Sequence, residues 1–291
     1  MSTSTEAPPL TFPKTPVPPN GPNPLGEGKK IKTAAALVIG DEILNGKTKD
    51  TNSNFFAKYC FELGIELKRI EVIADDEDEI VEAARRMVKN YDFVITTGGI
   101  GPTHDDITYA SIAKAFNQPL KYDEETLKRL TAHASRRPDI QNQTPEQKVA
   151  RERMALFPEN AEVIFVGEDI WVPVCRLEGK LCIFPGIPSL FQRLLAGLTP
   201  YLPLPDTRPF RYLIHTSLPE SSIAPYLTTL HERLKPEKIR VGSYPLLRLG
   251  VTVSLIGEDE ARIREIGEEV VREVQGKVVD QTDATGTPKP V

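Results

Sequence analysis

A glycine-rich loop carries the clearest chemical signal in the sequence: residues 97–106 read TGGIGPTHDD. Its three glycines let backbone N–H groups approach an anion closely, and a helix beginning near its end would present further N–H groups. Two threonine hydroxyls add donors. We therefore predict that the loop binds a phosphate group of a small molecule, through Thr97, Gly98, Gly99, Gly101 and Thr103.

Two carboxylates, Asp105 and Asp106, end this loop. Being anionic, they cannot bind phosphate directly, but they could hold a divalent cation that bridges to it. The alternative is a tight turn in which one of the two caps the following helix. The double aspartate beside the glycines favours a ligand site, with Asp105 and Asp106 as candidate catalytic residues.

Further carboxylates follow two other predicted strands. Asp41 and Glu42 come after the first strand, next to Gly40, and Asp75 and Asp76 come after the second. In a parallel sheet these strand ends share one rim with the 97–106 loop. Six carboxylates crowded without a cation would repel one another, so some should bind a metal or a cationic group of the substrate. Helix capping is the alternative for one residue of the 75–76 pair.

Several other polar residues leave two interpretations open. Asn52 and Asn54 either contact ligand hydroxyls or cap a helix, and His104 is either a base or a surface residue. Ser189 lacks the G-x-S-x-G context of a nucleophile elbow, so we interpret its turn as a helix cap that lines the pocket. A basic cluster is either a solvated face or the counterpart of a diphosphate; it comprises Arg136, Arg137, Lys148, Arg151 and Arg153.

The elements that must position these residues alternate between strands and helices. Apolar runs at 34–39, 65–73 and 93–96 predict buried strands, and amphipathic patterns from 52, 76 and 107 predict helices between and after them. This order implies a mostly parallel sheet covered on both faces, with ligands beyond the carboxyl ends of the strands. The fold class is therefore α/β, with a three-layer, mostly parallel sheet followed by a small α+β domain.

Composition also predicts the remaining helices and strands and the domain boundaries. Residues 120–155 predict polar helices, 163–166 and 181–184 predict strands, and 190–198 predicts a helix. After a proline-dense linker come strand, helix, two strands and helix between 212 and 275. We predict a disordered Pro-rich tail over 1–30, the main domain over 31–205, the small domain over 206–278 and a disordered tail over 279–291.

Composition restricts the function class. The 291 residues are 40% hydrophobic and 26% charged, with a formal net charge of −5, which argues against a dedicated nucleic-acid binder. The three cysteines form no CxxC pair, so a disulfide framework or zinc site is not expected. No apolar run approaches the roughly 20 residues that span a bilayer. By elimination we expect a cytoplasmic protein without nucleic-acid or membrane partners.

Four motifs in this order resemble the MoaB/Mog family of molybdopterin-binding proteins: GDEILNGKTKDTNSNF, VIADDEDEI, TGGIGPTHDDIT and FPGIPS. They are most similar to its CinA-type branch, which also forms the amino-terminal half of some eukaryotic FAD synthases. The resemblance covers residues 33–205, and residues 208–277 resemble the small domain that follows in that branch. Leu190 replaces an acidic residue of the family pattern, and residues 166–169 depart from its Asn-x-x-Gly pattern.

The resemblance implies a homo-oligomer, dimeric or trimeric, that binds a phosphate-bearing pterin or nucleotide. It also implies that Asp75 and Asp106 serve catalysis and metal handling. We therefore expect a metal-dependent nucleotide pyrophosphatase acting on an FAD- or ADP-ribose-like diphosphate. The metal would be of the Mg, Mn or Co class, held by Asp41, Glu42 and Asp106, with a monovalent cation as a further candidate. The alternatives are a non-catalytic molybdopterin or nucleotide binder and a molybdopterin adenylyltransferase-like enzyme.

Overall fold

The structure is a computed structural model that describes residues 10–17, 22–137, 140, 142–282 and 288–290. It divides into two compact units, Met1–Pro205 and Asp206–Val291. Each unit has its own sheet and its own hydrophobic core.

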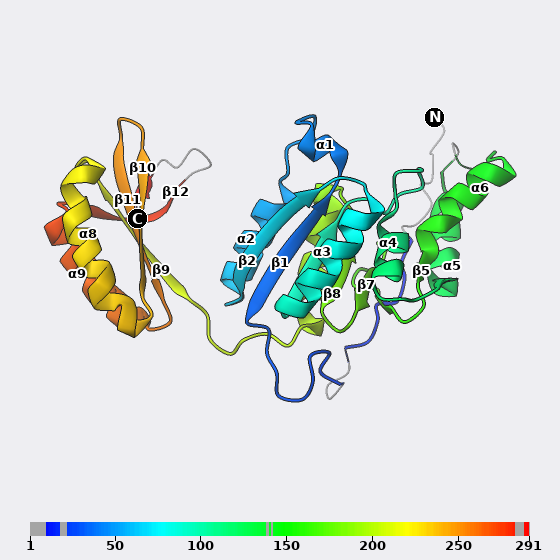
Figure 1. Ribbon diagram of the computed structural model, residues 1–291, viewed down its shortest axis with the longest axis horizontal. Helices are drawn as coiled ribbons and strands as arrows, with labels where there is room; N and C mark the ends of the chain where they lie inside the picture. Colours follow the sequence, from blue (N-terminus) through cyan, green and yellow to red (C-terminus); the bar gives the residue numbers. More distant parts are fainter. Residues whose placement is uncertain (1–9, 18–21, 138–139, 141, 283–287, 291) are drawn as a thin grey trace, which may run out of the picture. The chain divides into compact units, whose positions relative to one another are not determined.

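A six-stranded sheet forms the centre of the first unit (Figure 1). Its order is β2-β1-β3-β8-β7-β6, in which β2, β1, β3 and β8 run parallel while β7 and β6 add antiparallel pairs. This confirms the mostly parallel sheet. The strands are β1 Thr33–Ile39, β2 Glu66–Ile73, β3 Phe93–Thr97, β6 Glu162–Ile164, β7 Val174–Leu177 and β8 Leu181–Phe184.

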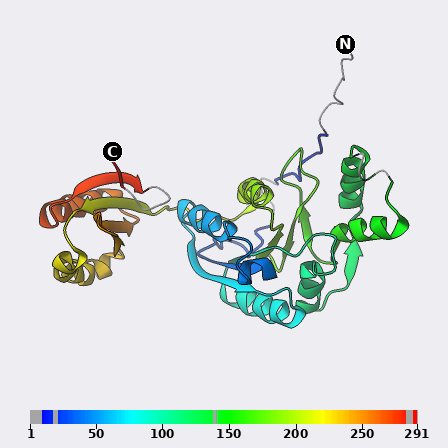
Figure 2. The same ribbon diagram turned by 90° about the horizontal axis from the view of Figure 1, so that it is seen from above.

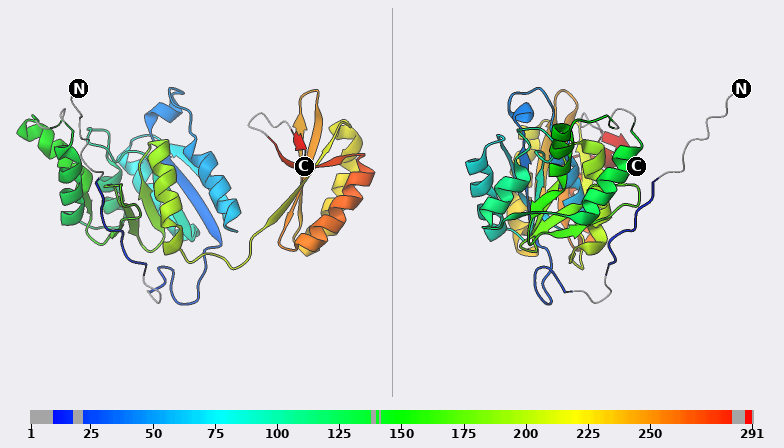
Figure 3. Two further views of the ribbon diagram at one scale, coloured as in Figure 1. Left: turned by 180° about the vertical axis from the view of Figure 1, so that it is seen from behind. Right: turned by 90° about the vertical axis from the view of Figure 1, so that its right-hand side faces the viewer.

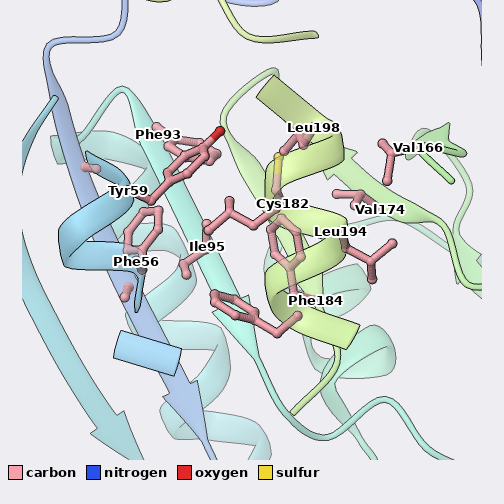
Figure 4. Close-up of a cluster of buried hydrophobic side chains, with 14 of the residues drawn as sticks. Phe56, Tyr59, Phe93, Ile95, Val166, Val174, Cys182, Phe184, Leu194 and Leu198 are labelled. Atoms are coloured by element: carbon pink, nitrogen blue, oxygen red, sulfur yellow. The ribbon is translucent and has the colours of Figure 1, made fainter. Parts of the chain in front are cut away.

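Helices cover both faces of this sheet (Figure 2). On one face lie α2 (Asn52–Glu62) and α7 (Pro188–Leu198), and on the other α3 (Glu77–Asn90) and α4 (Thr108–Ala115). Successive residues of a strand point to opposite faces, so β3 feeds both cores. Phe93 and Ile95 join the α2–α7 core, shown in Figure 4, whereas Val94 joins the α3–α4 core.

Further helices and strands, most of them short, complete the first unit. They are α1 (Asp41–Leu44), β4 (Leu120–Tyr122), α5 (Glu124–Ser135), α6 (Pro145–Glu152), the 3-10 helices at Arg153–Ala155 and Thr199–Tyr201, and β5 (Leu156–Pro158). The sequence predicted helices over 120–155 but not the β4–β5 pair, nor β7 or α1. Elements of three or four residues are too short to show a hydrophobic period.

The second unit is an antiparallel sheet in the order β10-β11-β9-β12-β13, with both helices on one face (Figure 3). Val251, Val253 and Leu255 of β11, the second strand in this order, pack against these helices. The elements are β9 Phe210–Thr216, α8 Glu220–Leu234, a 3-10 helix Lys235–Glu237, β10 Arg240–Leu246, β11 Gly250–Gly257, α9 Glu260–Glu273, β12 Lys277–Thr282 and β13 Pro288–Pro290.

Part of the expected N-terminal tail is ordered. The backbone N–H of Phe12 donates to Glu168 O (2.6 Å), and that of Thr15 donates to Phe165 O (2.9 Å). The buried guanidinium of Arg129 lies over the rings of Phe12 and Phe165, 5.1 and 3.6 Å from their centroids. Residues 10–17 therefore differ from the expected disordered tail, because one aromatic residue and several backbone groups find partners beside β6. Residues 1–9 and 18–21 lie outside the described part.

The C-terminal prediction also differs from the structure. Val279, expected in a disordered tail, belongs to β12 and pairs with Leu213 of β9. It is 5% exposed, so pairing and burial explain its order. Across the described residues, no helix combines the length and apolarity needed to cross a membrane.

Candidate functional site

Three strand ends meet closely at the carboxyl edge of the main sheet. The N–H of Gly98, after β3, donates to Phe184 O of β8 (3.2 Å). Gly98 has a φ of +110°, and a β-carbon there would overlap Ile39 O at the end of β1. A β-carbon on Gly186 would lie 3.5 Å from the Gly98 α-carbon. Glycine at position 98 therefore lets the ends of β1, β3 and β8 approach closely, whereas position 186 has room for a β-carbon.

A buried asparagine joins two of these loops. Asn52 Nδ2 donates to Thr97 Oγ1 (3.0 Å) and to Gly186 O (2.9 Å), and Thr97 Oγ1 donates to Pro185 O (2.9 Å). Asn52 is 6% exposed, and its Oδ1 accepts no hydrogen bond from any residue that the structure describes. The amide thus fixes the glycine-rich loop against the turn before α7 and keeps one acceptor unused.

Asp106 closes the glycine-rich loop on itself. Its Oδ1 accepts from Gly101 N (2.6 Å), and its Oδ2 accepts from Thr103 N (2.9 Å) and from Thr103 Oγ1. Helix α4 begins at Thr108 with Ile107 as its N-cap residue and no side-chain cap. Neither Asp105 nor Asp106 is therefore the helix cap that the sequence offered as an alternative.

One member of the predicted basic cluster holds the outside of this loop. Arg153 Nη1 donates to Thr103 O (2.9 Å), and its Nη2 donates to Asp106 O (3.1 Å). Other members bind elsewhere: Arg151 donates to Gln143, and Lys148 pairs with Glu152. Only Arg153 is thus tied to the loop by a hydrogen bond shown in the described residues.

Asp75 lies among like charges beside the loop. Its Oδ2 accepts from the backbone N–H of Asp41 (3.0 Å), and a β-carbon on Gly99 would lie 3.5 Å from its Oδ1. Partial burial raises the pKa of Asp75 above its ordinary value, although the N–H of Asp41 lowers it.

Three neighbouring carboxylates raise the same pKa further: Asp41, Glu42 and Asp105. None of the ion pairs among the described residues involves these four acids. Four of the six predicted carboxylates therefore lie near one another, and none of the four forms an ion pair with a described residue.

The carboxylates are not preassembled as a metal cage. In the described part of the chain, no group of three or more His, Cys, Asp or Glu side chains has the arrangement of a metal site. Asp106, predicted as a ligand with Asp41 and Glu42, directs its carboxylate into the loop. The donors still fit a hard cation of the Mg²⁺ type, because such an ion keeps several waters and takes one or two carboxylates plus substrate phosphate.

The predicted phosphate donors are only partly available. The N–H groups of Gly98, Gly101 and Thr103 are already used within the protein. Those of Gly99 and Ile100 donate no hydrogen bond to any described residue. Ser189 is exposed in the first turn of α7, beyond Pro188 at the first helical position.

Of the remaining predicted residues, two are exposed and one is buried. Asn54 is exposed in the first turn of α2, and His104 is exposed in the glycine-rich loop. Gly40 follows β1 and is buried, and a β-carbon there would lie 2.7 Å from the Glu42 carboxylate. The sequence left the same two alternatives open for Asn52 and Asn54, and it did not predict that Asn52 links two loops. The position of Asn52, at the buried start of an amphipathic helix, was the signal available.

Two family models match the chain. Residues 35–204 match the model described as "Probable molybdopterin binding domain", and residues 210–283 match "FAD synthase, middle domain". The first match covers the six-stranded unit and the second covers the antiparallel unit up to the end of β12.

Individual relatives agree with these models. A "Probable FAD synthase" of Caenorhabditis elegans is 34% identical over 231 residues, which is 75% of this chain and 44% of that protein. A protein of Thermoplasma acidophilum is 32% identical over 251 residues, 83% of this chain and 94% of its own length. The chain thus spans less than half the length of the FAD synthase that it matches.

A solved structure extends the comparison to three dimensions. It is described as the protein CinA with unknown function from Thermoplasma acidophilum, is 31% identical and has a TM-score of 0.51. The similarity covers 59% of this chain and 98% of that one.

Proposed function

Because the chain belongs to the family of probable molybdopterin-binding domains, we propose that it binds a nucleotide diphosphate at its strand ends and hydrolyses it with a divalent metal. The family membership confirms the MoaB/Mog-like, CinA-type resemblance of the sequence. Relatives named FAD synthase support a nucleotide related to FAD or ADP-ribose as the substrate. A phosphate-bearing pterin, such as molybdopterin, is the main alternative ligand.

One observation carries the proposal: Asp75 and three further carboxylates share a region that contains no paired cation. Such a cluster stabilises bound cations, and a divalent ion can bridge it to phosphate oxygens. When bound, the metal would polarise phosphorus and neutralise charge that develops on the leaving phosphate. Asp75 would hold it, together with Asp41, Glu42 or Asp105.

The loops would bind the rest of the diphosphate. The N–H groups of Gly99 and Ile100 are open to an anion, and the first turn of α7 presents further donors. Asp106 and Arg153 act through the loop: they hold its shape, so that the open N–H groups keep their direction. Asn52 fixes the distance between the loop and α7.

The reaction itself requires one water molecule. Its oxygen forms a bond to one phosphorus while the bridging P–O bond breaks, and the leaving phosphate takes the electron pair. The water proton passes to a carboxylate.

The test is an assay of purified protein with FAD and with ADP-ribose, in EDTA and then in Mg²⁺, Mn²⁺ or Co²⁺. We expect AMP plus FMN from the first substrate and AMP plus ribose 5-phosphate from the second, both only with metal. Asp75→Asn should lower the rate at least 100-fold, on the scale of about 3 kcal/mol for a lost electrostatic contact at the reacting centre.

Asp76→Asn is the matched control. The Asp76 side chain accepts from Asp78 N and Glu79 N as the N-cap of α3, and asparagine caps about as well as aspartate. It should therefore keep the wild-type rate. No product with any metal would reject the hydrolase. Tight nucleotide or pterin binding without turnover would then favour a non-catalytic binder.

A further inference from the structure

The ordered segment 10–17 packs against a buried cation of helix α5. Arg129 of this helix is 3% exposed, and its Nη2 donates to Pro13 O (2.8 Å). The guanidinium also lies over the ring of Phe12, 5.1 Å from the centroid. Arg129 Nη1 donates no hydrogen bond to any residue that the structure describes. Because a buried cation is costly without partners, the segment supplies part of what holds Arg129 and α5 in place.

The same segment is anchored at its other end by Thr15. The Thr15 N–H donates to Phe165 O (2.9 Å), and Thr15 Oγ1 accepts from Phe165 N (2.9 Å). Tyr201 Oη donates to Thr15 O (2.5 Å). The segment is therefore held by specific contacts on both sides of Pro13, and substitutions in it can release Arg129 without changing any residue of the candidate site.

The start of α5 is tied to the short stretch of chain that carries Arg153. Asp123, the N-cap residue of α5, donates its backbone N–H to Ala155 O (2.9 Å). The residue before it, Tyr122, pairs with Leu156 between β4 and β5. Arg153 and Ala155 belong to the same 3-10 helix. A displacement of α5 therefore reaches Arg153 through one short, hydrogen-bonded connection.

Arg153 in turn holds the outer side of the glycine-rich loop, by donating to Thr103 O and Asp106 O. This loop carries the N–H groups of Gly99 and Ile100, which donate no hydrogen bond to any described residue. Binding of an anion by backbone N–H groups depends on their direction. A continuous series of contacts thus runs from segment 10–17 through α5 to the proposed phosphate donors.

A second support keeps this region folded without the segment. The ring of Phe157 in β5 lies 4.8 Å from the ring of Tyr109 in α4, measured between centroids. Strand β5 therefore also packs on α4. Loss of the contacts of segment 10–17 should loosen the glycine-rich loop rather than unfold it.

We propose that segment 10–17 is a positioning element of the nucleotide site, which holds the glycine-rich loop in the conformation that binds phosphate. It acts at a distance, through Arg129 and Arg153, and takes no part in the chemical step. This role rests on the anion binding proposed for the loop. The segment should therefore affect the affinity for a phosphate ligand more than the rate of turnover.

The test compares the full wild-type chain with the double variant Phe12→Ala/Thr15→Ala, which removes one ring and one acceptor from the segment. Hydrogen exchange is measured at residues 99–106, and inorganic pyrophosphate is titrated in Mg²⁺. We expect exchange at Gly101 and Thr103 to become about threefold faster or more, and pyrophosphate to bind about threefold more weakly or more, within the range of coupling between linked sites. With FAD or ADP-ribose, KM should rise similarly while kcat changes less than about twofold.

Two controls separate positioning from a general loss of stability. Phe12→Tyr keeps an aromatic ring over the Arg129 guanidinium and should retain wild-type exchange and affinity. Cys60→Ala removes a buried side chain from the α2–α7 core. It should lower the free energy of unfolding without changing exchange at residues 99–106, because surface loops exchange by local opening.

Unchanged exchange at residues 99–106 in the double variant would overturn the proposal. An equal acceleration in Cys60→Ala would also overturn it, because the loop would then respond to stability alone. Faster exchange with wild-type pyrophosphate affinity would show that the segment does not position the phosphate donors. If the wild type neither binds pyrophosphate nor hydrolyses a nucleotide, the proposed function fails, whereas hydrogen exchange still decides whether the segment holds the loop.

Discussion

Neighbouring aspartates in the strand-end site have different contacts. Asp75 receives one backbone N–H and lies among other carboxylates, whereas Asp76 caps α3. Asp106 closes the loop with three hydrogen bonds, while its neighbour Asp105 is exposed. Substitution of an aspartate should therefore have different effects at neighbouring positions, and each variant has a matched control in the residue beside it.

The raised pKa of Asp75 predicts a pH-dependent stability. A carboxyl group whose folded pKa exceeds its unfolded pKa of about 4 favours folding below that value and loses this contribution as pH rises through the folded pKa. Asp75→Asn has no ionisable group at this position, so the variant does not lose this stability as the pH rises. Without metal, its melting temperature should therefore rise relative to wild type between pH 3.5 and pH 7. Thermal unfolding in EDTA across this range checks it; a constant difference would contradict it.

Asp106→Asn should weaken the loop rather than relieve repulsion. An amide nitrogen cannot accept from the N–H groups of Gly101 or Thr103, so at least one bond is lost, at a cost of about 1–3 kcal/mol. Hydrogen exchange at residues 99–106 should speed up, and denaturant unfolding should show the loss of stability. Asp105→Asn is the matched control and should change neither. Equal rates of hydrogen exchange in both variants would show that the loop does not depend on the hydrogen bonds of the Asp106 carboxylate.

Among the elements, the ordered segment 10–17 predicts a measurable contribution to stability. Phe12→Ala removes a ring that lies over the buried Arg129, whose Nη2 also donates to Pro13 O (2.8 Å). We expect a loss of about 1 kcal/mol in the free energy of unfolding, typical of a cation–π contact. Lys14→Ala, which breaks an exposed ion pair with Glu168, should cost less. Urea unfolding distinguishes them, and equal costs would argue against the aromatic contact.

The sequence predicted the long elements because burial imposes a period on them. Strands β1, β3 and β8 are mostly apolar, and α3 shows a clear apolar stripe that follows the N-cap at Asp76. The three-residue strands β4 and β5 have no such pattern. The ordered segment 10–17 depends on Phe165 and Arg129, more than 100 positions away, which local composition does not reveal.

For the site, the sequence predicted the general location but not the individual contacts. The gathering of acids followed from parallel strands ending at one edge, since that geometry depends only on element order. The hydrogen-bond partner of each group could not be predicted in this way. Whether Gly101 N–H meets a ligand or Asp106, and whether Asn52 or Asn54 faces the loop, depends on side-chain directions that only the folded chain defines.

At the scale of the whole molecule, the two units have separate cores with no residue in common. We therefore expect two unfolding transitions in denaturant. Leu194→Ala should lower the free energy of unfolding of the first unit only, and Leu227→Ala that of the second unit only. Each loss should be about 2–5 kcal/mol, as for a leucine removed from a core. Residues 206–291 expressed alone should reproduce the second transition. A single transition shifted by both substitutions would show one cooperative unit.

The backbone contact among the ends of β1, β3 and β8 also limits how this site can diversify. Gly98 faces a carbonyl oxygen and has a φ of +110°, so even alanine is excluded there, and Gly186 touches it from the next loop. New ligand preferences in descendants of this chain must therefore arise at exposed positions around the contact, such as Asn54, Ile187 and Ser189. A saturation library should tolerate many residues at those three positions and almost none at Gly98, even when only folding is selected.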